Sequence, residues 1–288
     1  MRINDECLPC TLKTALQIIR NATEDEKLRK IAIAKVAKAF GEVSWNEYPI
    51  ELAYVVHGIV REVIGVRDPY KEIKRRSNDL ALSIYPKLKK IVEDFDDKLE
   101  AAARLAIAGN AIDFCVHTQL DLEESIEKAV KEELKVNDYG LFKERVSKAR
   151  TVIYFLDNAG EIVFDKLLLE TMLEVVDEPY KKITIVARGG PLLNDSLIED
   201  VRYVGLDKLP NVELRCVSNG EEGTGPPPMS DEVRGWIKDH DLAISKGQAN
   251  YEILHEVKDI FLLLIVKCPV VAESVGAKVG DLVLKYSG

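Results

Sequence analysis

The chain has 288 residues, of which 47% are hydrophobic and 31% are charged, and its formal net charge is −9. This length and composition suit a globular protein of one large domain or two moderate ones. The negative charge opposes non-specific attraction to nucleic acid or an anionic membrane, so we expect neither as a partner. The N-terminal sequence does not resemble a signal peptide, and the longest apolar run, residues 260–266, is too short to cross a bilayer. We therefore expect a cytoplasmic protein.

The first 149 residues read almost entirely as helix. Apolar residues recur at helical spacing in six segments: 11–22, 26–40, 49–65, 68–93, 97–116 and 121–134. Asp68 and Pro69 form a typical helix start, with proline in the first turn. The sequence therefore predicts a helical N-terminal region over residues 1–149.

From residue 150 onward, strands and helices alternate. Mostly apolar, β-branched runs predict strands at 151–157, 182–188, 212–218, 241–247, 260–267 and 281–286. Helical segments separate several of them, at 163–176, 196–201 and 231–239. This alternation is typical of an α/β fold in which a mostly parallel sheet is covered on both faces. We expect this unit to occupy residues 150–288.

Polar side chains follow two of these strands at the point where each strand ends. Asp157 and Asn158 end the first strand, and Gly160 and Glu161 come directly after them. The second strand runs into a glycine-rich turn that contains Asp195. Burying a carboxylate costs several kcal/mol unless it is paired or bound to a cation. Because ligands bind at the carboxyl ends of strands in open parallel sheets, we expect these groups to gather at one edge.

The fourth predicted strand adds a cation to the same edge. It ends at Lys246 and Gly247, and Asn250 follows closely. Carboxylate and amide oxygens are hard ligands, suited to Mg²⁺ or Mn²⁺. A lysine supplies a compact charge for a phosphoryl oxygen, and glycines let backbone N–H groups approach an anion. These groups together are suited to phosphoryl transfer.

Each of these residues also has a purely structural interpretation. Asp157 and Asp195 are well placed to be helix N-caps, and Lys246 to be a solvated lysine at a strand end. Asn110 and Asp113 lie three residues apart, so they share one helix face among apolar residues. They are either a buried pair that caps a neighbouring helix or a pair that contacts the substrate.

The five cysteines are odd in number, which argues against a disulfide framework. Cys7 and Cys10 form a single C-x-x-C at the start of a predicted helix. No second close cysteine pair accompanies it and no strand precedes it, so zinc-finger and thioredoxin patterns are both incomplete. We expect a structural or accessory role, with a metal or redox role as the alternative. The sequence also lacks the glycine-rich or nucleophile motifs of Rossmann dehydrogenases, P-loop NTPases and serine hydrolases.

Five motifs carry a family resemblance over nearly the whole chain: CLPC, AGNAIDF, DNAGEIVFD, RGGPLLNDS and SKGQANYE. Their combination and order resemble the metal-dependent damage-control phosphatase family, also called domain of unknown function 89. The resemblance is closest to the compact microbial branch, which carries the C-x-x-C. It implies a helical N-terminal region on a three-layer α/β/α core, and hydrolysis of phosphomonoesters such as sugar phosphates or damaged metabolites.

The resemblance also implies roles for individual residues. A divalent ion, Mg²⁺ or Mn²⁺ with Co²⁺ or Ni²⁺ as alternatives, is expected on Asp157, Asn158 and Asp195. A substrate phosphate is expected near Lys246, which makes Asp157, Asp195 and Lys246 the expected catalytic residues. The residues expected to contact substrate are Asn110, Asp113, Gly160, Glu161, Gly247 and Asn250.

The expected reaction is metal-assisted hydrolysis of a small phosphorylated metabolite. The attacking group is either a water molecule on the metal or Asp157, which would form a phospho-enzyme. One alternative is methyl transfer from S-adenosylmethionine to a carboxylate, although the turn after the first strand has a single glycine. Another is a sugar-phosphate or nucleotide sensor without turnover.

Overall fold

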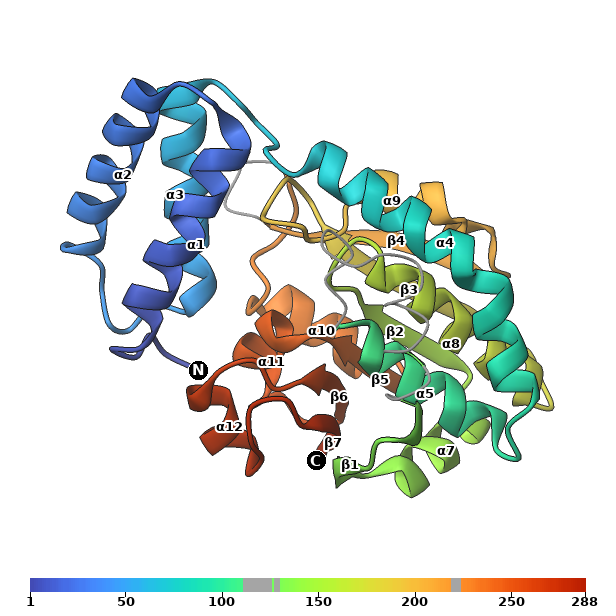
Figure 1. Ribbon diagram of the computed structural model, residues 1–288. Helices are drawn as coiled ribbons and strands as arrows, with labels where there is room; N and C mark the ends of the chain where they lie inside the picture. The colour runs from blue at the N-terminus through green and yellow to red at the C-terminus, as the bar shows by residue number, and fades with distance from the viewer. Residues whose placement is uncertain (111–125, 127–129, 219–223) are drawn as a thin grey trace.

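A seven-stranded sheet forms the centre of the molecule (Figure 1). The computed structural model describes residues 1–110, 126, 130–218 and 224–288. In spatial order, the strands are β1 (Leu134–Asn137), β7 (Leu282–Ser287), β6 (Ile260–Ile265), β5 (Leu242–Lys246), β2 (Thr151–Phe155), β3 (Lys182–Arg188) and β4 (Val212–Val217). The strands from β6 to β4 are parallel, β7 is antiparallel to β6, and β1 is parallel to β7. The predicted mostly parallel sheet is therefore confirmed.

All six predicted strands are present, with bounds within two residues of those expected. The sequence analysis missed β1, which lies in the region that was expected to be helical. Its residues Leu134 and Val136 are the inward-facing ones, and Lys135 and Asn137 are exposed. A strand of four residues shows this alternation too briefly to stand out after a helical segment.

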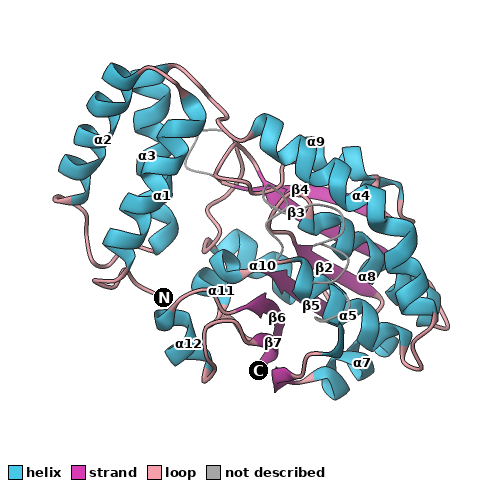
Figure 2. Cartoon of the chain, in the orientation of Figure 1, coloured by secondary structure: helices cyan, strands magenta, loops and turns pink. Residues whose placement is uncertain are grey.

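Helices cover both faces of the sheet (Figure 2). Along β2, Val152 and Tyr154 join the core on one face, whereas Ile153 and Phe155 join the core on the other. The helices of the first face are α4 (Lys71–Glu93), α5 (Lys98–Gly109), α7 (Tyr139–Lys148), α8 (Glu161–Val175) and α9 (Ile198–Val204). Those of the second face are α10 (Asp231–Lys238), α11 (Gln248–Leu254) and α12 (Pro269–Val275). The three-layer α/β/α arrangement is confirmed.

The remaining helices, α1 (Cys7–Ala22), α2 (Glu26–Phe40) and α3 (Pro49–Ile64), pack around a core of their own beside the sheet (Figure 1). The helical N-terminal region is thus confirmed. Because α4, α5 and β1 lie in the sheet layers although they precede residue 150, the division at that residue stays a prediction. No helix of the described residues, including the 23-residue α4, has the length and apolarity needed to span a membrane.

Glu252, on α11, is expected to make the stability of the fold depend on pH. Burial raises the pKa of Glu252 from 4.5 to about 7, although a hydrogen bond from Gln248 and the N-terminal ammonium act to lower it. Because the pKa of Glu252 is higher in the folded chain than in the unfolded chain, the protonated carboxyl stabilises the folded state at low pH. This stabilisation is lost as the pH rises from about 4.5 to about 7. Relative to Glu252→Gln, the wild-type free energy of unfolding should therefore fall between about pH 4.5 and 7, by at most about 3 kcal/mol. Urea denaturation across this range measures the difference, and a difference independent of pH would contradict the expectation.

Candidate active site

Two loops at the carboxyl edge of the sheet hold the predicted metal ligands together. Asp157 and Asn158 follow β2, and Asp195 follows β3. The backbones of Asn158 and Asp195 pair in an isolated antiparallel bridge. The N–H and hydroxyl groups of Ser196 both donate to the main-chain oxygen of Asp157, at 2.8 and 2.9 Å. The structure thus places Asp157 and Asp195, each 5% exposed, on two loops that are joined through their backbones.

The turn after Asp157 is fixed by a residue of the N-terminal region. Gly160 has φ +83°, which favours glycine, and α8 begins at the next residue, Glu161. The N–H of Gly160 donates to Oδ1 of Asn78 on α4 at 2.7 Å. Asn78 is fully buried, and its Nδ2 donates to Asp200 at 2.9 Å. The sequence analysis missed Asn78, because the sequence of α4 does not distinguish a buried asparagine from a solvated one.

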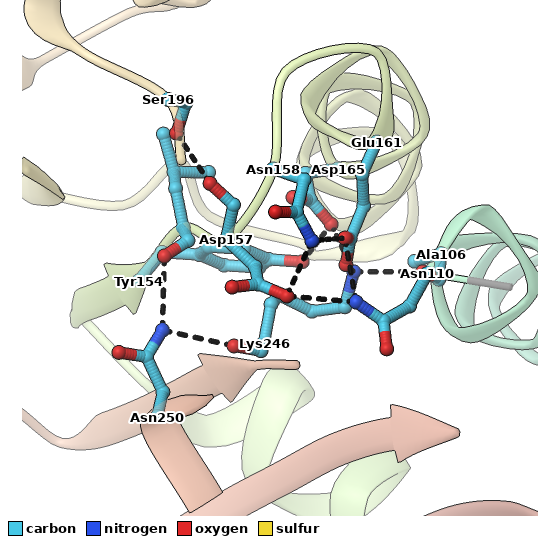
Figure 3. A network of polar contacts seen from close by, with 11 residues as sticks. Ala106, Asn110, Tyr154, Asp157, Asn158, Glu161, Asp165, Ser196, Lys246 and Asn250 are labelled. Atoms are coloured by element: carbon cyan, nitrogen blue, oxygen red, sulfur yellow. Dashed lines mark hydrogen bonds and ion pairs between the residues drawn. The ribbon is translucent and has the colours of Figure 1, made fainter. Parts of the chain in front are cut away.

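Lys246 is fully buried at the end of β5, and its ammonium group is surrounded by acceptors (Figure 3). Its Nζ donates to the main-chain oxygen of Ala106 at 2.7 Å. It also donates to Oε1 of Glu161 at 2.8 Å and to Oδ1 of Asp165 at 2.6 Å. Burial lowers the pKa of Lys246, but the two carboxylates outweigh burial and raise it. Lys246 thus donates one hydrogen bond to each of three acceptors and offsets one of the two carboxylate charges. Its expected contact with a substrate phosphate stays a prediction.

Asp165 is a member of this network that the sequence analysis missed. It is fully buried on α8 and accepts a hydrogen bond from the hydroxyl of Tyr154 at 2.8 Å. Burial, only partly offset by Lys246, raises the pKa of Asp165 to about 6. The signal was available: Glu161 and Asp165 lie four residues apart among apolar residues, so they share one buried helix face.

Asn110, at the end of α5, lies within the site, as the sequence analysis expected. Its Nδ2 donates to Oδ2 of Asp157 at 2.8 Å and to Oε2 of Glu161 at 2.7 Å (Figure 3). Asn158 donates to the same two oxygens, at 2.8 and 3.2 Å. The Oδ1 atom of Asn110 is buried without a hydrogen-bond partner among the described residues. Asp113, the other predicted residue of this motif, lies outside the described residues.

Arg188 is a buried cation that the sequence analysis did not select. It ends β3, is 4% exposed, and donates from Nε to Oδ2 of Asp195 at 2.6 Å. Its Nη2 donates to Oδ1 of Asn250 at 3.3 Å, and Nη1 is buried without a partner among the residues described. Asn250 in turn donates to the main-chain oxygens of Leu156 and Lys246, both at 2.9 Å. Arg188 therefore has the NH₂ group of Nη1 without a partner among the described residues, beside the predicted metal ligands.

Position 247 requires glycine, because the carboxylate of Asp157 occupies the space that a Cβ would fill. A Cβ at position 247 would lie 1.8 Å from Oδ2 of Asp157, and the glycine has φ +80°. The N–H of Gly247 donates to the main-chain oxygen of Leu263 at 3.0 Å, and that of Gly160 is held by Asn78. In the structure these two N–H groups are already used by the protein, so their expected contact with phosphate stays a prediction.

Gly247→Ala is expected to destabilise the chain by about 1–3 kcal/mol from backbone strain alone, and to displace Asp157 as well. Gly58→Ala in α3 is the matched control, because no atom of the described residues lies within 4 Å of the added Cβ. This substitution should stabilise the chain by about 0.4–1 kcal/mol. Thermal denaturation of both variants measures the contrast. Equal stabilities of the two variants would show that the carboxylate of Asp157 does not lie against position 247.

Among the described residues, the buried charges at the site do not balance. They comprise four carboxylates and two cations: Asp157, Glu161, Asp165, Asp195, Lys246 and Arg188. Burial and then the charges of Glu161 and Asp195 raise the pKa of Asp157 well above its usual value. Burial, opposed by Arg188, also raises the pKa of Asp195, whereas Lys246 outweighs burial and lowers that of Glu161. With every group ionised, two negative charges are left over, which is the charge that one divalent cation would neutralise.

The side chains present also fit a hard cation chemically. Asp157, Asn158 and Asp195 supply carboxylate and amide oxygens. Oδ1 of Asn110, which has no partner in the described part of the chain, lies nearby. No three histidine, cysteine, aspartate or glutamate side chains are arranged to hold a metal within the described part of the chain. The predicted set has only two such residues, so its remaining ligands would be amides and water.

Two cavities open beside these residues. One of about 190 Å³ reaches Asp195 and runs between α1, α3 and α11. Another, of about 530 Å³, is lined by Arg188, Gly189 and Gly190. A larger cavity of about 1070 Å³ lies at the opposite edge of the sheet, next to Arg150 and Asp241, and contacts none of the site residues. The first two cavities give access to the predicted metal ligands from the part of the chain that the structure describes.

Comparison with known proteins identifies the family of this chain. Residues 3–283 match the model of the damage-control phosphatase ARMT1-like domain. The chain belongs to this family. A damage-control phosphatase of Archaeoglobus fulgidus is 36% identical over 293 residues, covering 99% of both chains. One from Pyrococcus horikoshii is 34% identical over 290 residues, covering 98% of this chain and 97% of the relative.

The fold of the family is also shown directly. The crystal structure of a domain of unknown function 89 protein from Pyrococcus horikoshii superimposes with a TM-score of 0.87 at 32% sequence identity, covering all of both chains. The resemblance identified from the five sequence motifs is thus confirmed, together with the fold that it implied. Family membership supports a phosphatase activity, whereas the individual site residues and the metal stay predictions.

Proposed function

We propose that this family member is a divalent-metal-dependent phosphatase of small phosphomonoesters, such as sugar phosphates or damaged phosphorylated metabolites. The observation that carries the proposal is the buried cluster of four carboxylates and two cations at the carboxyl edge of the sheet. Such an excess of buried negative charge is costly in the absence of a cation. The phosphatase names of the family and of two relatives support the reaction type.

Asp157, Asn158 and Asp195 would hold the ion, with Mg²⁺ or Mn²⁺ preferred and Co²⁺ or Ni²⁺ as alternatives. When bound, such an ion acts as a Lewis acid that neutralises charge on a phosphoryl oxygen. Asp157 would lose its proton on loading of the site, because the raised pKa of this carboxyl results from burial and neighbouring negative charges.

The other residues of the chain orient the substrate and stabilise charge. Nη1 of Arg188, which has no hydrogen-bond partner among the described residues, would donate to an equatorial phosphoryl oxygen, while Nε keeps Asp195 in place. Asn110 and Asn158 fix the carboxylate of Asp157 through its Oδ2. That leaves Oδ1 of Asp157 for the ion, or for attack on phosphorus if the reaction passes through a phospho-enzyme.

The direct test is phosphate release from a panel of sugar phosphates and other phosphomonoesters, with Mg²⁺, Mn²⁺, Co²⁺, Ni²⁺ or a chelator. We expect turnover with at least one divalent ion and none with the chelator. Turnover that a chelator leaves unchanged would contradict the metal dependence. Thermal stabilisation by a phosphate ester without phosphate release would instead indicate a sensor.

A further inference from the structure

Three cysteines from opposite ends of the chain line the same cavity of about 190 Å³. Cys7 and Cys10 lie at the start of α1, and Cys268 directly precedes α12. Figure 1 shows the N-terminus beside α11 and α12, where these segments meet. Cys216, on β4, does not line this cavity. Of these three cysteines, Cys7 and Cys10 lie in the same helical turn, whereas Cys268 comes from a distant segment of the chain.

The first turn of α1 holds Cys7 and Cys10 in a geometry that permits a disulfide. Residues three apart on an α-helix share a face, with Cα atoms about 5 Å apart. Disulfides form at Cα separations of about 4.4–6.8 Å. The hydroxyl of Thr11 donates to the carbonyl oxygen of Cys7 at 2.9 Å, and that of Thr14 to the carbonyl oxygen of Cys10 at 3.2 Å. These two bonds brace the turn in which the cysteines lie.

The two thiols differ in exposure and in hydrogen bonding. Cys10 is exposed, whereas Cys7 is partly buried and its Sγ accepts a hydrogen bond from the N–H of Asn4 at 3.4 Å. Burial raises the pKa of Cys7 and Cys10, and the negative charge of Glu252 adds to the effect. A reagent from solution therefore meets Cys10 first, and Cys7 is the neighbouring thiol that can complete the exchange.

We propose that Cys7 and Cys10 are a reversible dithiol–disulfide site that reacts with low-molecular-weight disulfides. The Cys10 thiolate attacks one sulfur of the small disulfide, whose S–S bond breaks and releases one thiol. The Cys7 thiolate then attacks Sγ of Cys10 and displaces the second thiol. In sum, two protein thiols are oxidised to one disulfide, and one small disulfide is reduced to two thiols that carry the two protons. The cavity beside these thiols also reaches Asp195, but the exchange itself uses no residue of the proposed phosphatase reaction.

Oxidised glutathione is the probe for this site, and tryptic peptides show which cysteines have reacted. Trypsin would release Cys7 and Cys10 together in peptide 3–13, Cys268 in peptide 268–278 and Cys216 in peptide 216–234. After the full chain is oxidised and its free thiols are alkylated, we expect peptide 3–13 to be unalkylated and lighter by two hydrogens. Peptides 268–278 and 216–234 should be alkylated, and prior reduction should restore two alkylation sites on peptide 3–13.

The variants Cys268→Ser and Cys216→Ser should leave this result unchanged, whereas Cys10→Ser should abolish the internal disulfide. A disulfide between peptides 3–13 and 268–278 would overturn the pairing. Complete alkylation of peptide 3–13 after oxidation, or a stable glutathione adduct on Cys10, would overturn the proposal. So would thiols that react only after a chelator has removed a bound metal.

Discussion

Lys246→Met is expected to destabilise the folded chain by about 3–5 kcal/mol, because it removes the cation from a buried ion-pair network. Glu161 and Asp165 would lose their hydrogen bonds of 2.8 and 2.6 Å and stay buried. Urea denaturation measures the loss. Lys148→Met is the matched control: its 2.7 Å pair with Glu144 is exposed to solvent, so its loss should change the stability far less than Lys246→Met does.

A double variant distinguishes the effect of removing the charge of Lys246 from the effect of removing its packing contacts. Adding Asp165→Asn to Lys246→Met removes one of the two stranded negative charges, so it should recover part of the lost stability. A double variant no more stable than Lys246→Met would show that packing of the lysine side chain, rather than charge, accounts for the effect.

Asp157→Asn is expected to lower phosphate release by at least about 10²-fold, the loss typical of removing one group that stabilises transition-state charge. The stabilisation of the chain by Mg²⁺ or Mn²⁺ should weaken in parallel. The metal-free variant should unfold at no lower temperature than the wild type, because the substitution removes a carboxylate whose raised pKa reflects repulsion and burial.

Phosphate release with varied Mn²⁺ and thermal unfolding with and without the ion test this expectation. Asp177→Asn, at an exposed position, is the matched control and should change neither readout. If folded Asp157→Asn protein released phosphate at the wild-type rate, Asp157 would be neither an essential metal ligand nor the nucleophile.

The sequence predicted the elements of the sheet well, because the apolar strands after residue 150 are long and separated by clear helical segments. It also placed Asp157, Asp195 and Lys246 at one edge, since parallel strands end together. It could not predict which acceptors surround Lys246. That depends on where α5 and α8 pack, and no local pattern encodes it.

The roles of the missed residues also depend on how distant segments of the chain pack together. Arg188 ends a predicted strand in the same way as an ordinary surface arginine, and only the fold shows that it is buried against Asp195. Asn78 is polar on an amphipathic helix, where solvated residues are common, although it is fully buried. Asp165 was the exception, because its spacing from Glu161 on an apolar helix was visible in the sequence.

The hydrogen bond from Gly160 to Asn78 bears on whether the two halves of this protein can be separated. A fragment containing only residues 150–288 would lack Asn78 and Asn110, and the carbonyl oxygen of Ala106 that accepts from Lys246. Such a fragment would keep every expected metal ligand, but the two loops that carry them would lack these contacts from α4 and α5. Transplanting the α/β half onto another scaffold would therefore have to bring α4 and α5 with it.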